Sequence, residues 1–181
     1  HNFGNLFLPA MVQLTNGDFE RAVKETSKVL AIRGKVVPST VSNVHLVAEY
    51  WDGTQTEGEA AIPNPKSSIK RLSLTPQEAH PTKDAVAAID EADIIILGPG
   101  SLYTSVIPNL IIKGMDEAIA KAYAFKIYVC NVMTQHGETD GYSASDHVKA
   151  IIEHSQTGVM DSCLINNADA PTDALGRYKN E

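Results

Sequence analysis

The chain has 181 residues, of which 43% are hydrophobic, and a formal net charge of -7 from 15 basic and 22 acidic side chains. This length suits one compact domain over residues 1–181, without a linker or a low-complexity stretch. The negative charge repels a polyanion, so a nucleic-acid partner is disfavoured, and no apolar stretch approaches the roughly 20 residues that span a bilayer.

The two cysteines, Cys130 and Cys163, lie far apart, each within an apolar run and outside any Cys-x-x-Cys arrangement. This usage is typical of buried free thiols in a reducing compartment. We therefore expect a soluble, cytoplasmic protein. Because His1 leads directly into a Gly/Asn-rich stretch without an initiator methionine, we also expect a further segment ahead of it.

From Asp18 onward, apolar residues recur at helical spacing, which predicts an amphipathic helix with Asp18 as its N-cap and Gly34 at its end. Alternating polarity then predicts an antiparallel hairpin insertion over about 36–75, on the edge of a larger sheet. Its strands are expected at 44–50, 54–59 and 69–74, with a turn at Asp52-Gly53.

The second half predicts helices over Lys83–Glu91, 115–122 and 145–154, and strands over Ala92–Leu97, 126–131 and 162–166. The order β-α-β-α-β indicates an α/β fold with a doubly wound, mostly parallel sheet. The continuous run of Ile and Leu before Gly98 predicts a strand buried on both faces. Residues 77–83 form an exposed connector in this interpretation.

The turn Gly98-Pro99-Gly100-Ser101 follows this buried strand directly. Glycines at such a strand end let the backbone approach a phosphate, although many strands leave through glycines with no ligand nearby and Pro99 lacks an amide donor. In open α/β sheets, ligands bind beyond the carboxyl ends of the strands. We therefore expect the polar stretches 98–105, 131–146 and 166–167 to converge.

The loop after Asn131 is too long and too polar for a plain connection. Asn131 and Gln135 suit hydrogen bonds to sugar hydroxyls or a base edge, Thr134 and Thr139 suit phosphate oxygens, and Tyr142 offers a face for stacking. Two acidic residues follow in the same loop. Glu138 and Asp140 either hold Mg²⁺ against a diphosphate, act as a base, or lie solvated on the surface.

Several other residues allow two interpretations each. Ser145 is expected to cap the helix that follows, and Asp146 either supports that cap or contacts a ligand. His147 and His154 lack the closer spacing of a zinc pair. Two further sites lie near the ends of the chain. Gly4 and Asn5 either donate amides to an anion or cap a helix, and Arg177 either pairs with phosphate or lies on the surface.

Two enzyme classes fit poorly. The sequence Gly98-Pro99-Gly100-Ser101 is not the Gly-x-Ser-x-Gly elbow of a Ser-His-Asp hydrolase. A nicotinamide-dependent dehydrogenase needs a Gly-x-Gly-x-x-Gly turn with an acid roughly 20 residues later, and no such pattern is visible.

Four ordered blocks resemble the bacterial gluconeogenesis factor family, namely His1–Leu6, Ser27–Gly34, Leu97–Ser105 and Asn131–Thr139. That family belongs to the CofD-like superfamily, which also contains the 2-phospho-lactate transferase of deazaflavin coenzyme synthesis. The resemblance implies a Rossmann-like fold whose first strand leads into a glycine-rich turn. Because no such block precedes His1, the chain resembles an internal portion of a longer protein that extends beyond Glu181.

The resemblance further implies a site for UDP-N-acetylglucosamine. Phosphate contacts would come from Gly98, Gly100, Ser101 and Ser105, and the pocket would be lined by Asn131, Thr134, Gln135, Glu138 and Thr139. Tyr142 and Arg177 would contact the nucleotide sugar. Gly4, Asn5 and Asn166 complete the candidate nucleotide-binding set, and no metal ligand is assigned.

Two functions remain open. The first is a regulatory protein that binds the UDP-sugar and supports cell shape and envelope synthesis during gluconeogenic growth, with a protein partner in envelope precursor synthesis. The alternative is a CofD-like transferase that acts on a nucleotide-diphosphate adduct of 2-phospholactate with Mg²⁺. For either function we expect a homo-oligomer, and no cofactor other than Mg²⁺ with the nucleotide diphosphate.

Overall fold

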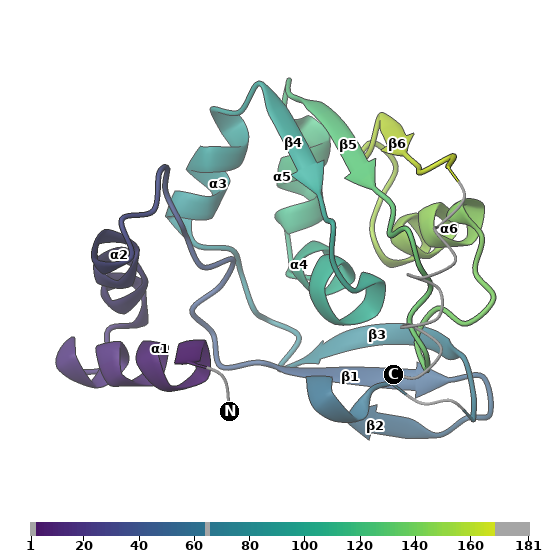
Figure 1. The fold of residues 1–181 in the computed structure, drawn as a ribbon, viewed down its shortest axis with the longest axis horizontal. Coiled ribbons are helices and arrows are strands. Elements are labelled where there is room, and N and C mark those ends of the chain that lie inside the picture. Colours follow the sequence, from purple (N-terminus) through teal and green to yellow (C-terminus); the bar gives the residue numbers. More distant parts are fainter. Residues whose placement is uncertain (1–2, 64–65, 169–181) are drawn as a thin grey trace.

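The computed structural model describes residues 3–63 and 66–168. Its second half alternates strands and helices in the order β4 (Ile94–Leu97), α5 (Met115–Lys121), β5 (Phe125–Val129), α6 (Ala144–His154) and β6 (Ser162–Leu164) (Figure 1). The strands pair in parallel in the order β4-β5-β6. The α/β fold class with a parallel sheet, expected from the sequence, is confirmed.

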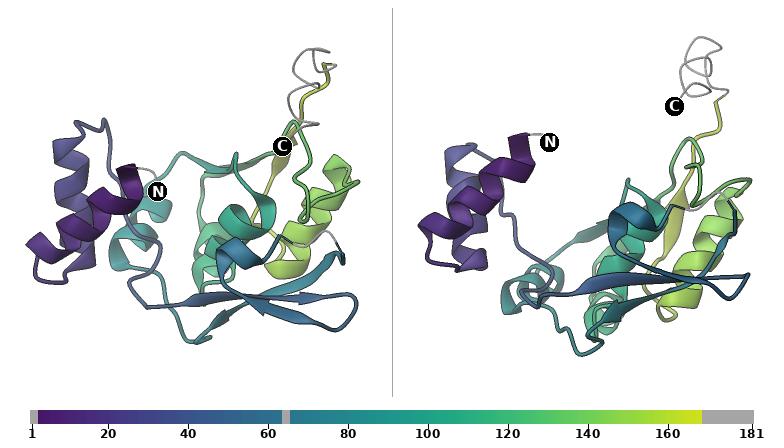
Figure 2. Two further views of the ribbon diagram at one scale, coloured as in Figure 1. Left: turned by 60° about the horizontal axis from the view of Figure 1, so that its bottom comes forward. Right: turned by 90° about the horizontal axis from the view of Figure 1, so that it is seen from below.

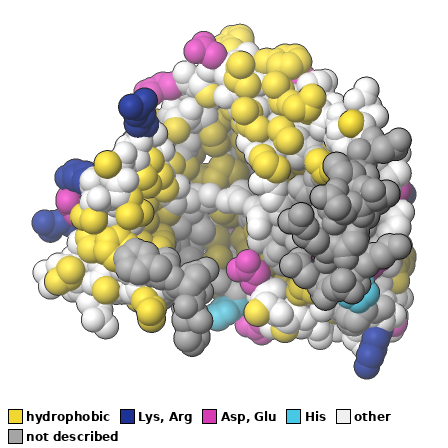
Figure 3. Space-filling view, viewed as in Figure 1, with side chains coloured by type: hydrophobic (Ala, Val, Ile, Leu, Met, Phe, Trp, Pro, Cys, Tyr) yellow, Lys and Arg dark blue, Asp and Glu magenta, His cyan; other side chains and the backbone are white. Residues whose placement is uncertain are grey.

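One face of this parallel sheet is open within the described residues. In β4, Leu97 is buried, whereas Ile94 and Ile96 on the opposite face are 57% and 59% exposed. Phe125, which pairs in register with Ile94, is also exposed, as is Leu164 of β6. Figure 3 shows hydrophobic side chains gathered over this part of the molecule. The prediction of a strand buried on both faces is therefore wrong here, because the described helices cover only one of them.

A second, antiparallel sheet consists of β1 (His45–Tyr50), β2 (Gln55–Glu57) and β3 (Ile69–Thr75) in the order β2-β1-β3. The expected turn joins β1 to β2: Gly53 has φ 84°, and Asp52 Oδ1 accepts the Thr54 N–H at 2.9 Å. A short 3₁₀ helix, η1 (Glu59–Ala61), follows β2. No ladder joins β1, β2 or β3 to the parallel sheet in the described residues. The prediction that the hairpin extends the edge of the larger sheet is therefore wrong.

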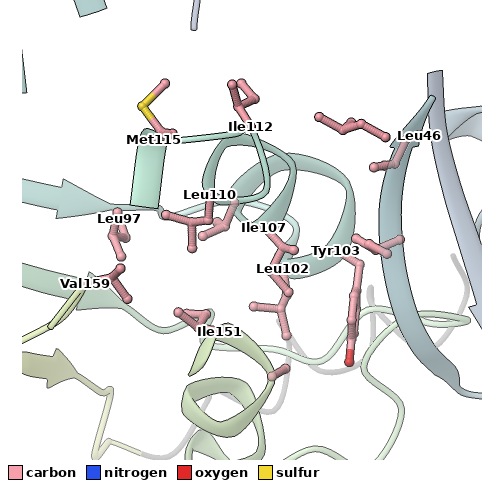
Figure 4. Packing of buried hydrophobic residues seen from close by; sticks show 14 of the residues in the cluster. Leu46, Leu97, Leu102, Tyr103, Ile107, Leu110, Ile112, Met115, Ile151 and Val159 are labelled. Carbon is pink, nitrogen blue, oxygen red and sulfur yellow. The ribbon is translucent and has the colours of Figure 1, made fainter. Parts of the chain in front are cut away.

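Between the two sheets lie a π-helical turn, η2 (Leu102–Val106), and the short helix α4 (Ile107–Leu110), neither of which was predicted from the sequence. Leu102 and Ile107 are fully buried, and they meet Leu97 of β4 and Ile151 of α6 in the core (Figure 4). Leu46 of β1 reaches the same cluster from the antiparallel sheet. A single core therefore connects the two sheets through η2 and α4.

The amino-terminal helices α1 (Phe3–Leu14) and α2 (Phe19–Val29) pack on each other beside this body (Figure 2). Asp18 is the N-cap of α2, as predicted, and its Oδ1 accepts the Arg21 N–H at 2.9 Å. Helix α2 ends at Val29, earlier than the predicted end at Gly34.

Helix α3 (Lys83–Asp90) begins at Thr82, whose hydroxyl oxygen accepts the Ala85 N–H. Asp84 in its first turn forms salt bridges of 3.0 Å with Lys24 and 3.1 Å with Lys35, which tie α2 and the loop after it to α3. Among the residues that the structure describes, no helix combines the length and the apolar character needed to cross a membrane.

Candidate functional site

Polar segments from three strand ends meet at the carboxyl edge of the parallel sheet. Asn131, just after β5, donates from Nδ2 to the Gly100 carbonyl oxygen at 2.9 Å, and its Oδ1 accepts the Gly100 N–H at 3.4 Å. Asn166, after β6, lines the same hollow as Asn131. The structure thus brings together the three polar stretches expected to converge, because parallel strands end at one edge of their sheet.

The glycine turn after β4 is shaped by its contact with β5. Gly98 has φ +85°, and a Cβ built on it would lie 3.1 Å from the Val129 carbonyl oxygen. The peptide bond between Gly98 and Pro99 is cis. Glycine is required at this position both by the backbone conformation and by the close approach of the neighbouring strand end. This requirement exists whether or not a phosphate binds at the turn.

A buried carboxylate ties the polar loop to this turn. Glu138 is only 5% exposed, and its Oε2 accepts a hydrogen bond from the Ser101 hydroxyl at 2.5 Å. Thr104 Oγ1 lies 2.6 Å from Ser101 Oγ and 3.4 Å from Glu138 Oε1. Ser101 is also the N-cap of η2. The interpretation of Glu138 as a solvated surface residue is therefore wrong.

The carboxyl edge holds a cavity of about 190 Å³ between the loops after β5 and β6 and the start of α6. Four of the candidate residues from the sequence line it: Asn131, Thr134, Tyr142 and Asn166. The remaining lining residues are Cys130, Val132, Ser143, Ala144, His147 and Ile165. We call this hollow the edge pocket.

The amino end of α6 forms one wall of the edge pocket. Ser143 is the N-cap, and a capping box joins it to Asp146: the Ser143 oxygen accepts the Asp146 N–H, and Asp146 Oδ2 accepts the Ser143 N–H at 2.8 Å. The predicted cap, Ser145, is therefore wrong by two residues. The Ser143 hydroxyl also donates to Asp146 Oδ2 at 2.6 Å. This bond, followed by the one from the Ser143 N–H, holds the pKa of Asp146 below its usual range, so the carboxylate stays charged.

A set of aromatic rings packs against the pocket; Tyr103, Tyr128 and His147 are buried, and Tyr142 is half-buried. Tyr128 Oη lies 2.9 Å from His147 Nδ1, and Tyr103 Oη lies 2.8 Å from Tyr142 Oη. The ring of Tyr142 stands edge-on to that of His147, with centroids 5.7 Å apart. Burial lowers the pKa of His147, so the ligand-free ring is neutral near pH 7.

Other candidate residues from the sequence do not line the edge pocket. Thr139 is fully buried, and its hydroxyl oxygen accepts the Gln135 N–H at 2.8 Å. Gln135 Oε1 is a buried acceptor with no hydrogen-bond partner among the described residues. Gly98 and Ser105 line a different hollow, of about 550 Å³, along α3, β4 and α4.

The structure places the amino-terminal candidates away from this edge. Gly4 and Asn5 lie in the first turn of α1, which is at the opposite end of the molecule from α6 (Figures 1 and 2). Arg177 lies outside the described residues. The binding roles of these three residues stay predictions.

The acidic pair of the loop does not form a joint cation site. Asp140 Oδ2 accepts the Gly137 N–H at 2.6 Å, and its Oδ1 lies 3.0 Å from His136 Nδ1, whereas Glu138 bonds to Ser101. No cluster of three or more metal-binding side chains occurs in residues 3–63 and 66–168. The two carboxylates therefore do not fit a Mg²⁺ ion held between them.

Two residues of the edge pocket were missed by sequence reasoning. The sequence pattern marks His147 only as one of two histidines that are spaced too widely for a zinc pair, and Cys130 only as a core thiol. Both residues are buried and line the cavity. The signal for His147 was its place four residues after Ser143, on the side of α6 that carries Ile151. A larger hollow of about 540 Å³ lies along α2 and the loop after it, and none of the candidate residues from the sequence lines it.

Comparisons with known proteins agree with this fold. The model of the family described as 2-phospho-L-lactate transferase CofD matches residues 1–181. Proteins named gluconeogenesis factor from Halalkalibacterium halodurans and Bacillus subtilis are 47% and 49% identical over 181 residues. A crystal structure of a upf0052 family member from Bacillus halodurans superposes with a TM-score of 0.94 at 47% identity, covering all of this chain and 58% of that one. The chain spans 56% and 57% of the two curated relatives.

Proposed function

This chain belongs to the CofD family, and from that premise we propose that it binds a nucleotide sugar, UDP-N-acetylglucosamine, at the edge pocket. In this proposal the protein is a regulator that supports cell shape and envelope synthesis during gluconeogenic growth. The name gluconeogenesis factor, carried by relatives 47% and 49% identical, favours the regulatory branch of the family.

The observation that carries the proposal is the convergence of Asn131, Thr134, Tyr142 and Asn166 on one cavity at the carboxyl edge of a parallel sheet. This edge is where open α/β folds bind nucleotides. These four residues line the same hollow, although they come from loops after two different strands. The sequence alone predicts each of them as a contact to a nucleotide sugar.

Each part of the pocket suits a part of the ligand. The first amides of α6, at Ala144 and Ser145, are not used within the helix and are available to a diphosphate. Thr134 is exposed and supplies a hydroxyl, and the ring of Tyr142 supplies an apolar face for the base or the sugar. Asn131 acts through Gly100, because both ends of its amide are bonded to that residue.

A cavity of about 190 Å³ encloses only part of a nucleotide sugar. The diphosphate is the part that the start of α6 attracts, so the base and the sugar would extend along the neighbouring loops. The unpaired Gln135 Oε1 is one acceptor there that a ligand hydroxyl would satisfy.

Isothermal titration calorimetry of the full chain against UDP-N-acetylglucosamine, GDP and NAD tests this proposal. We expect saturable heat with the UDP-sugar, and weaker or no heat with the other two nucleotides. The absence of any heat with the UDP-sugar would overturn the proposal.

The second candidate is a transferase acting on a nucleotide-diphosphate adduct, and the printed description of the matching family, 2-phospho-L-lactate transferase, favours it. Turnover of such an adduct with Mg²⁺ would establish it. Because Glu138 and Asp140 do not converge on a cation, the metal would have to be held mainly by the substrate diphosphate.

The free thiols Cys130 and Cys163 support our proposal of a cytoplasmic location. A homo-oligomer and a protein partner in envelope precursor synthesis stay predictions.

A further inference from the structure

In the part of the chain that the structure describes, the edge pocket lacks a positively charged side chain to match the negative charge of the proposed ligand. A diphosphate brings two negative charges, yet no lysine or arginine of the described chain lines the pocket. Asp146 next to it is negative, and the whole chain has a net charge of -7. The amino end of α6 offers only a partial positive charge. Within the described residues, a full positive charge at the pocket therefore has to come from a group that gains a proton.

His147 is the one group in the pocket that can acquire a full positive charge near neutral pH. Its side chain is 97% buried and lines the cavity. Nδ1 is bonded to Tyr128 Oη at 2.9 Å, while Nε2 has no hydrogen-bond partner in the described part of the chain. One ring nitrogen is thus bonded to Tyr128 of the sheet, and the ring itself lines the cavity.

The groups facing His147 do not change charge in the same pH range. Burial raises the pKa values of Tyr128 on β5, of Cys130 just after β5 and of Cys163 on β6, so these groups stay neutral. On α6, Asp146 stays charged, with Lys149 near it. The Tyr142 ring also packs edge-on against the His147 ring.

We propose that His147 takes up a proton from solvent when the nucleotide sugar binds, and that the resulting imidazolium neutralises the diphosphate together with the amino end of α6. In the charged ring, Nδ1–H donates to Tyr128 Oη and Nε2–H donates to a phosphate oxygen. No covalent bond forms or breaks, and only one proton moves. This inference rests on the proposed function.

Because ligand binding and proton uptake by His147 are coupled, the affinity for the ligand should depend on pH. Burial keeps the ligand-free ring neutral at pH 7, whereas the bound anion favours the charged ring. Between the two pKa values, the affinity for the ligand falls by up to about tenfold for each unit of increasing pH. UDP-N-acetylglucosamine is the correct probe, because its phosphates are both esterified, whereas the terminal phosphate of UDP titrates near pH 6.

The test is calorimetry of the full chain with UDP-N-acetylglucosamine from pH 6 to 8, in pairs of buffers that differ in ionisation enthalpy. We expect uptake of about 0.5 to 1 proton per ligand in the wild type and none in His147→Gln. His136→Gln is the matched control, because His136 lies in the neighbouring loop and is exposed; it should retain the uptake. An NMR titration of the His147 ring in the wild type gives the same answer without a variant.

Binding without proton uptake, or equal uptake in wild type and His147→Gln, would overturn the inference and leave the nucleotide-sugar proposal intact. An NMR spectrum in which the His147 ring stays neutral in the saturated complex would do the same. No binding of the UDP-sugar at any pH would overturn the proposed function, and this inference with it.

Discussion

The backbone N–H of Leu72 donates to Nε2 of His154 at 3.0 Å, joining β3 of the antiparallel sheet to α6 of the parallel one. His154 Nδ1 bonds to the Ala150 carbonyl oxygen at 2.7 Å, so this nitrogen carries the ring proton and Nε2 is the acceptor. A neutral imidazole therefore connects the antiparallel sheet to α6, the helix between β5 and β6, although the two sheets share no strand pairing in the described residues.

Acid should weaken the fold through this histidine. Burial lowers the pKa of His154 from its ordinary value of 6.5. Below pH 6.5 the unfolded chain binds the proton first, so the stabilising contribution is complete above that pH. It is lost as the pH falls towards the lower folded value, by at most about 1.4 kcal/mol per pH unit. Urea unfolding at pH 7.5, 6.5 and 5.5 measures this slope.

His154→Gln is the control for that experiment, because glutamine keeps an acceptor for the Leu72 N–H but does not titrate. We expect a smaller slope of unfolding free energy against pH in this variant. An unchanged slope would mean that other groups, His147 among them, account for the acid sensitivity.

Glu138→Ala should destabilise the protein by about 1 to 3 kcal/mol, because it leaves the Ser101 hydroxyl without its buried acceptor and opens a void. The matched control is Glu153→Ala on α6, whose carboxylate is exposed and lies 3.7 Å from Lys149; its effect should be within about 0.5 kcal/mol. If chemical denaturation showed equal losses of unfolding free energy in the two variants, the hydrogen bond from Ser101 to Glu138 would not be what stabilises the contact between the polar loop and the glycine turn.

Gly98→Ala should cost more stability than Gly53→Ala, although both glycines have nearly the same positive φ, of 85° and 84°. At Gly53 a Cβ would meet nothing within 4 Å, so we expect only the backbone penalty of about 1 kcal/mol. At Gly98 the new Cβ would lie 3.1 Å from the Val129 carbonyl oxygen. We therefore expect Gly98→Ala to lose about 1 to 2 kcal/mol more unfolding free energy than Gly53→Ala. Thermal melts of the two variants compare the costs directly.

Tyr142→Ala should weaken binding of the UDP-sugar by about 1 to 3 kcal/mol through loss of the aromatic face, as should Arg177→Ala if that residue reaches the ligand. Tyr142→Phe separates the ring from the hydroxyl: it loses the bond to Tyr103 but keeps the ring beside His147. We expect near-normal affinity for this variant in calorimetry. If the alanine variant at position 142 binds as well as the wild type, the ring is not a ligand contact.

Local patterns in the sequence were sufficient for much of the secondary structure. Apolar spacing gave α2, α3, α5 and α6, and the capping preference of Asp18 located the start of α2. Alternation of strands and helices was enough to predict parallel pairing, because a crossover helix leaves little other choice. The meeting of polar segments after β4, β5 and β6 follows from the same rule.

Only the tertiary structure decided which partners these residues meet. Periodicity shows that β4 is apolar on both faces but not what covers each face, so the exposure of Ile94 and Ile96 could not be predicted. Glu138 and Ser101 are 37 residues apart in the sequence. Residues at this separation need not be in contact, so no local sequence pattern predicts the hydrogen bond between them. The same holds for the contact of His147 with Tyr128 across the helix and sheet. Local sequence sets backbone conformation over a few residues, whereas burial and charge in the edge pocket depend on how whole elements pack.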